Sequence, residues 1–225
     1  MNTNQIIPAL ITSDEDSTND FEELKLKFEK LQPFLSEFDN WVQIDITDGK
    51  FVSTKTNVEL TDLKYFTEKA SVEFHLMLDR PEKTIGEWAR LGPERIIAHI
   101  EAVENMDELL NVCREKNIEV GLALNPETAN VIIEPWLNAV DMVAFLGVHP
   151  GRSGQEFIPE VLDKIKSLRQ NFPNVKIEVD GGVGLANIVE LKKAGADVFV
   201  IGSGILKSPD IRAAIQELKH VRLYS

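Results

Sequence analysis

The sequence predicts a single (β/α)₈ barrel over residues 1–225. Two observations carry this prediction. Eight short runs rich in Ile and Val alternate with amphipathic segments, and this alternation is typical of a parallel sheet with helical crossovers. Eight such units in 225 residues match the size of a (β/α)₈ barrel. The alternative, an open doubly wound sheet, is disfavoured because no Gly-x-Gly-x-x-Gly follows the first run.

The expected strands are apolar and alternate only in part, as strands buried on both faces should. They cover residues 5–11, 41–46, 71–78, 95–100, 119–124, 141–148, 176–179 and 198–201.

Apolar stripes predict helices between these strands. Residues 20–38 and 159–172 each carry such a stripe, and a third helix is expected to end at Gly195, a residue type favoured at helix ends. The first few residues and the segment 10–20 are the parts expected to be loose.

The composition argues against several classes of partner. No run approaches the ~18 apolar residues that span a bilayer, and the N-terminus lacks the basic start of a signal peptide. The net charge of −13 argues against nucleic acid and anionic membranes as partners, because both require a basic surface. The single Cys113 cannot form an internal disulfide and is expected to be a buried thiol. We therefore expect a cytoplasmic protein.

Polar side chains mark the carboxyl ends of the strands, where barrel active sites form. Gln43 and Asp45 are two positions apart in the second strand, so they share a face, which points into the barrel if the apolar residues between them pack outward. His75 in the third strand and Asp180 in the seventh would then converge with Asp45. Two carboxylates placed together repel each other unless a cation or a proton intervenes. A divalent metal bound by Asp45, His75 and Asp180 is the natural remedy.

Each of these residues also has a purely structural explanation. A lone histidine in a strand is usually a core residue, as we expect for His99, and Asp48 before Gly49 fits a turn. Convergence from three separate strands is what favours a functional site.

Two pairs of small residues predict a phosphate site. Gly181 and Gly182 follow the seventh strand, and Gly202 and Ser203 follow the eighth. Barrels commonly bind phosphate at this location, since glycine lets backbone N–H groups approach the oxygens.

Motifs along the whole chain resemble the ribulose-phosphate 3-epimerase family. They are "IPALITSD", "IDITDGKFV", "FHLML", "AHIEA", "GLALNPET", "VHPGRSGQEFIPEVLDKI", "EVDGGVGLANI" and "AGADVFVIGSGI". The resemblance implies an enzyme that interconverts D-ribulose 5-phosphate and D-xylulose 5-phosphate at C3. It implies Asp45 and Asp180 as the acid–base pair, and a divalent ion (zinc, iron, manganese or cobalt) held by these aspartates, His75 and a second histidine. It also implies substrate contacts, which we assign to His75, Gly151, Gly154, Gly181, Gly182, Gly202 and Ser203. The loop from Gly151 to Gln155 would close over the sugar.

The chain departs from the family pattern at the reacting end of the site. Gln43 stands in place of the second histidine, which makes it a doubtful fourth ligand. The other departures are Ala9, Thr47, Lys50, Val58, Leu146, Arg152 and Ser153. Three functions stay open: the epimerase itself, a related ketose-phosphate enzyme that could use Lys50 as its cation, or a sugar-phosphate-binding protein without catalysis. The sequence also leaves open whether the chain forms a homo-oligomer.

Overall fold

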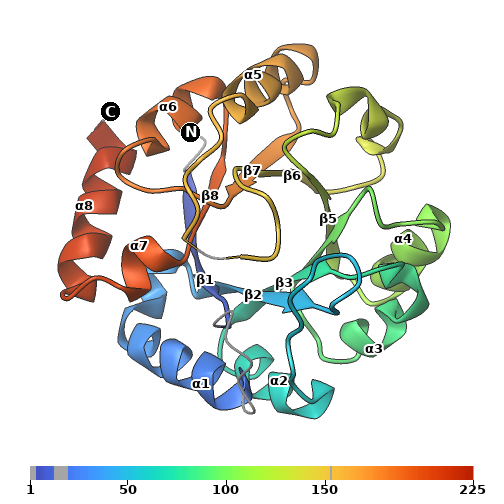
Figure 1. Cartoon of the computed structure of the whole chain (residues 1–225), viewed down its shortest axis with the longest axis horizontal. Helices are drawn as coiled ribbons and strands as arrows, with labels where there is room; N and C mark the ends of the chain where they lie inside the picture. The colour runs from blue at the N-terminus through green and yellow to red at the C-terminus, as the bar shows by residue number, and fades with distance from the viewer. Residues whose placement is uncertain (1–3, 13–19, 153, 225) are drawn as a thin grey trace.

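The computed structural model describes residues 4–12, 20–152 and 154–224, and in them eight parallel strands close into a barrel ringed by helices (Figure 1). Each strand pairs with its neighbour in sequence, and β8 pairs with β1. The strands are β1 (Gln5–Leu10), β2 (Trp41–Thr47), β3 (Ser71–Met77), β4 (Arg95–His99), β5 (Glu119–Leu124), β6 (Met142–Leu146), β7 (Lys176–Asp180) and β8 (Val198–Ile201). The predicted fold class is confirmed, and every expected strand is present with ends shifted by two residues at most.

Helices and short 3₁₀ segments connect the strands on the outside of the barrel (Figure 1). The α-helices are α1 (Asp20–Leu31), α2 (Leu60–Thr67), α3 (Ile85–Ala89), α4 (Met106–Glu115), α5 (Val161–Asn171), α6 (Ile188–Ala194), α7 (Ser203–Leu206) and α8 (Ile211–Tyr224). The 3₁₀ segments are η1 (Gln32–Phe38), η2 (Pro81–Lys83), η3 (Asn130–Ile132) and η4 (Glu134–Trp136). The connection between β5 and β6 contains only η3 and η4.

Two of the predicted helices are present as expected, and one is divided. The predicted helix over 20–38 divides into α1 and η1, because Pro33 has no N–H to continue the α-helical hydrogen bonds. Helix α5 lies within the predicted range 159–172. Helix α6 ends as predicted at Gly195, whose φ of 112° suits glycine. The expected loose segments fall largely on residues 1–3 and 13–19, which lie outside the described residues.

The main core lies between the strands and the helices. Val42, Ile44 and Ile46 of β2 point outward into it, as expected from the alternation in this strand. Phe28 of α1 and Phe66 of α2 pack edge to face there, with 5.4 Å between their ring centroids. Cys113 is fully buried in the same core, and burial raises the pKa of its thiol to about 12, so it is the structural thiol that the sequence predicts.

The inside of the barrel holds a buried charged layer that the sequence analysis did not anticipate. Glu73, Arg95 and Glu178 are each at most 1% exposed. The Arg95 guanidinium donates to Glu73, lies 3.9 Å from Glu178 and stacks 4.5 Å from the centre of the Trp41 ring. Desolvation of Glu178, with the Glu73 charge beside it, holds the pKa of Glu178 well above its usual range. This layer forms the floor beneath the candidate site.

No helix in the described parts of the chain is long and apolar enough to cross a membrane.

Candidate active site

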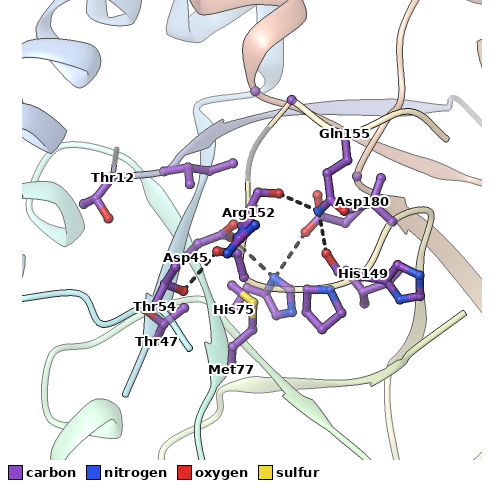
Figure 2. Close-up of a pocket in the computed structure, with 18 of the residues that line it drawn as sticks. Thr12, Asp45, Thr47, Thr54, His75, Met77, His149, Arg152, Gln155 and Asp180 are labelled. Atoms are coloured by element: carbon purple, nitrogen blue, oxygen red, sulfur yellow. Dashed lines mark hydrogen bonds and ion pairs between the residues drawn. The ribbon is translucent and has the colours of Figure 1, made fainter. Parts of the chain in front are cut away.

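A pocket of about 730 Å³ opens at the carboxyl ends of the strands. Asp45, His75 and Asp180 lie at its base, and the loops that follow β2, β6, β7 and β8 form its walls (Figure 2). Position in the barrel dictates this arrangement, because side chains two apart on a strand share the inner face. Asp45 therefore lies one layer above Gln43, and Asp180 one layer above Glu178.

Asp45, His75 and Asp180 form one compact buried group. Asp45 and His75 are direct partners in the pairing of β2 with β3. Nδ1 of His75 lies 3.4 Å from Oδ1 of Asp45 and 3.2 Å from Oδ2 of Asp180. The structure thus brings together three residues that the sequence placed on three separate strands.

The Gln43 side chain joins this group from below. It is fully buried, and its amide nitrogen Nε2 donates to Oδ1 of Asp45 at 2.7 Å and to Oδ2 of Asp180 at 2.8 Å. The same nitrogen lies 3.5 Å from Nδ1 of His75. Its amide oxygen Oε1 is buried without a hydrogen-bond partner among the described residues. Gln43 is therefore the centre of the carboxylate pair and not a peripheral neighbour.

The electrostatics of the group favour a charged His75. Burial opposes the imidazolium, but hydrogen bonds and charges from Asp180 and Asp45 outweigh it and raise the pKa of His75 to about 10. Burial also raises the pKa of Asp45, and the nearby charge of Asp180 adds to this effect. The site therefore holds a cationic ring beside a carboxyl group whose pKa is raised.

His99 belongs to the site, although its sequence context suggested only a core residue. Its Nε2 lies 2.9 Å from Nε2 of His75, and its Nδ1 lies 3.4 Å from a carboxylate oxygen of Glu101. Glu101 in turn accepts hydrogen bonds from Thr128 and from the backbone N–H of Asn125. The pairing of β3 with β4 explains this contact. His75 pairs with Ile97, so His99, two residues further along β4, lies on the same inner face one layer higher.

The chemistry of the group suits a divalent metal ion. The ligand atoms of Asp45, His75 and Asp180 all lie within 4.8 Å of one another, so the group could hold such an ion. Two conditions apply to that fit. His75 must release a proton, since a ligating histidine is neutral. The amide of Gln43 must also turn away, because its N–H groups now point at both carboxylates.

The glycines after β7 and β8 line the pocket, but the need for a glycine differs between the two positions. Gly181 and Gly182 have φ of 94° and 67°, and a Cβ on Gly182 would lie 2.8 Å from the backbone of Phe157. These two glycines are therefore required by the fold itself. A Cβ on Gly202 would meet only ordinary contacts, the nearest being 3.4 Å from Ile11, so no contact among the described residues demands a glycine there. Ser203 follows as the first residue of α7 and also lines the pocket.

The loop after β6 folds over the pocket and is tied to the loop after β2. Gln155 donates to the carbonyl oxygens of His149 and Arg152 at 2.7 and 2.9 Å (Figure 2). Thr54 donates to the carbonyl oxygen of Gly151 at 3.0 Å. Gly151, Gly154 and Arg152 line the pocket.

Two other residues singled out in the sequence lie at the edge of this arrangement. Asp48 forms the expected turn, since its carboxylate accepts from the backbone N–H groups of Lys50 and Phe51. Lys50 is exposed and does not line the pocket, so the structure gives no support to Lys50 as the cation of the site; the lysine that lines the pocket is Lys55.

Fold and site together define a (β/α)₈ barrel with a buried Asp–His–Asp group and a glycine-lined pocket at one mouth. Comparison with known proteins gives the family. Residues 18–206 match the model of the ribulose-phosphate 3-epimerase family, and the chain belongs to this family.

Individual relatives agree with this assignment. The ribulose-phosphate 3-epimerase of Schizosaccharomyces pombe is 32% identical over 96% of this chain and 92% of its own. That of Aquifex aeolicus is 36% identical over 80% of this chain and 83% of its own. Among solved structures, KGPDC from Streptococcus mutans has a TM-score of 0.71 at 14% identity, with 99% of this chain and 98% of that chain covered. A tryptophan synthase α-subunit from Pyrococcus furiosus has a TM-score of 0.66 at 19% identity, with 98% of each chain covered. These two structures show the shared fold alone.

Proposed function

We propose that the protein is an isomerase that interconverts D-ribulose 5-phosphate and D-xylulose 5-phosphate. The observation that carries this proposal is the pairing of two buried aspartates from opposite parts of the barrel, Asp45 and Asp180, at the base of one pocket. A protein that only bound a sugar phosphate would have no use for two apposed carboxylates, which destabilise each other.

Epimerisation at C3 requires a base on one face of the sugar and an acid on the other. The proton on C3 is acidic because the carbanion is delocalised into the C2 ketone as an enediolate. One aspartate removes this proton, and the other returns a proton to the opposite face; the two exchange roles in the reverse direction. The raised pKa of Asp45 suits the residue that acts as the acid.

The charged His75 contributes to the same step. Its ring lies between the two carboxylates and keeps a positive charge close to them. This charge offsets the negative charge that develops on the enediolate. A divalent ion held by Asp45, His75 and Asp180 would supply the same stabilisation when bound, and the family resemblance implies zinc, iron, manganese or cobalt for this ion.

The phosphate of the substrate is assigned to the loops after β7 and β8. Gly182, Gly202 and Ser203 line that side of the pocket, and their backbone N–H groups would receive its oxygens. The loop after β6, with Gly151 and Gly154, would close over the sugar and exclude water. The acidic net charge of −13 does not oppose this, because a local nest of N–H groups binds an anion on an acidic protein.

The wider setting follows from the same proposal. The partner is a small sugar phosphate, with neither nucleic acid nor membrane involved, and the protein is placed in the cytoplasm. Self-association into a homo-oligomer is compatible with this function.

A coupled assay tests the proposal. Purified protein is given D-ribulose 5-phosphate, and formation of D-xylulose 5-phosphate is followed with an enzyme that consumes only the latter. Product formation that disappears in Asp180→Asn supports the proposal. Absence of product from the folded wild-type protein, both with chelator and with added Zn²⁺ or Mn²⁺, would overturn it in favour of a related substrate or a binding function.

A further inference from the structure

We propose that Gln43 is a positioning residue whose amide group stands in for a cation between Asp45 and Asp180, so that a divalent ion binds only by displacing it. The inference rests on the proposed function for its meaning, but its evidence and its test concern only the residues of the site.

The first step is the use of both hydrogens of one amide. A carboxamide nitrogen carries two N–H donors and no acceptor. Nε2 of Gln43 directs them to Asp45 and Asp180 at 2.7 and 2.8 Å. The two carboxylates come from β2 and β7, which are not adjacent in the barrel, so no backbone pairing fixes their separation. The Gln43 amide is a direct hydrogen-bonded link between them.

The second step is the orientation of that amide. An end-for-end turn would place Oε1 within about 2.8 Å of two carboxylate oxygens, where three acceptors would face one another. The network therefore assigns the nitrogen to the centre of the site. The cost of this choice is visible, because Oε1 is buried and has no partner among the described residues. Oε1 stays without such a partner as long as Nε2 donates to the two carboxylates.

The third step is the conflict with an ion. A metal bonded to carboxylate oxygens lies about 2.0–2.2 Å from them. An ion in contact with Oδ1 of Asp45 and Oδ2 of Asp180 would meet the two amide hydrogens that now point at these same oxygens. The Gln43 side chain must then move away, or its amide group must turn end for end. In the second case Oε1, which now lacks a hydrogen-bond partner among the described residues, becomes a ligand of the ion. The glutamine is thus a competitor of the ion in one orientation and a weak donor in the other.

This account predicts the sign of a mutational effect. If the amide competes with the ion, removal of the side chain in Gln43→Ala should strengthen metal binding, because the carboxylates lose the bridging donor that lies nearest to both of them. If Gln43 were chiefly a ligand, the same change would weaken binding, and if it were a mere neighbour, binding would not change.

The test is calorimetric titration of chelator-stripped protein with Zn²⁺, with thermal unfolding recorded alongside. Gln43→Ala should bind Zn²⁺ at least about tenfold more tightly than wild type, unfold at a lower temperature in chelator, and regain its midpoint when Zn²⁺ is added. Met77→Leu, which changes another pocket residue two positions from His75, is the matched control and should keep the wild-type affinity. Equal or weaker Zn²⁺ binding by Gln43→Ala, or no binding by either protein, would overturn the proposal.

A second measurement needs only the wild-type fold. In the ¹⁵N spectrum of the metal-free protein, both side-chain amide protons of Gln43 should be shifted downfield and protected from solvent exchange. They should move on saturation with Zn²⁺. Rapid exchange in the metal-free protein, or Zn²⁺ binding that leaves these signals unchanged, would contradict the bridge. Neither measurement involves turnover, so failure of the proposed epimerase activity would not be confused with failure of this inference.

Discussion

The imidazole rings of His75 and His99 are stacked, with 5.1 Å between their centroids and 2.9 Å between their Nε2 atoms. A hydrogen bond between two ring nitrogens requires one N–H and one lone pair. His75 is the donor, because its two neighbouring carboxylates raise its pKa to about 10, and His99 is the neutral acceptor, because burial lowers its pKa to about 4. The two rings therefore carry different charges across the whole range from pH 4 to 10.

The depressed pKa of His99 makes stability depend on pH. An unfolded histidine titrates near pH 6.5, so between about 6.5 and about 4 the unfolded chain binds a proton that the folded protein does not. The free energy of unfolding should fall as pH decreases through this window, by up to about 3 kcal/mol from this residue. Urea unfolding of chelator-treated wild type and His99→Gln at several pH values checks this. The wild-type curve should fall more steeply below pH 6.5, and parallel curves would contradict the assignment.

The two glycine positions should respond differently to alanine. Gly202→Ala places a methyl group in ordinary contact with Ile11 but in the way of a phosphate, so the fold should persist while affinity for ribulose 5-phosphate falls at least about tenfold. Gly182→Ala forces a positive φ on alanine and drives its Cβ against Phe157, so it should lower the free energy of unfolding by about 2 kcal/mol or more. Ligand titration and urea unfolding of both variants separate the effects. Unchanged affinity in folded Gly202→Ala would argue against the phosphate assignment.

The buried charge layer should be intolerant of losing its one cation. Arg95→Met leaves Glu73 and Glu178 in the barrel without a positive partner, and breaking a buried ion pair in this way typically costs about 3–5 kcal/mol. The exposed Arg90 provides the control, since Arg90→Met should change stability by no more than about 0.5 kcal/mol. Equal unfolding midpoints for the two variants would show that the layer contributes little.

The sequence was informative about the barrel because its eight apolar runs alternate with amphipathic segments, which is the pattern of a parallel sheet covered by helices. The positions of Asp45, His75 and Asp180 followed from the same logic, since strand ends in a barrel share one mouth. The contact between Gln43 and Asp180 could not be predicted, because the two residues lie 137 positions apart and meet only when the barrel closes. The charged layer was missed for a related reason. Glu73 and Glu178 share inner faces with His75 and Asp180 by a simple period of two, but nothing local shows that Arg95 reaches both.

The central claim is that Asp45 and Asp180 move the C3 proton of a pentulose 5-phosphate. The general acid–base role predicts a loss of about 10²–10⁴-fold in rate when either carboxylate is replaced by an amide. Asp45→Asn and Asp180→Asn are suitable variants because each keeps the shape of the side chain. Thermal unfolding of both establishes that they fold.

Incorporation of solvent deuterium at C3 of ribulose 5-phosphate, followed by proton NMR, tests this claim most directly because it reports proton removal without any coupling enzyme. Wild-type protein should exchange the C3 proton, and each asparagine variant should lose this exchange by at least about 10²-fold while still folded. Wild-type protein that leaves the C3 proton in place, with and without added divalent metal, or folded variants that exchange it at the wild-type rate, would contradict the account.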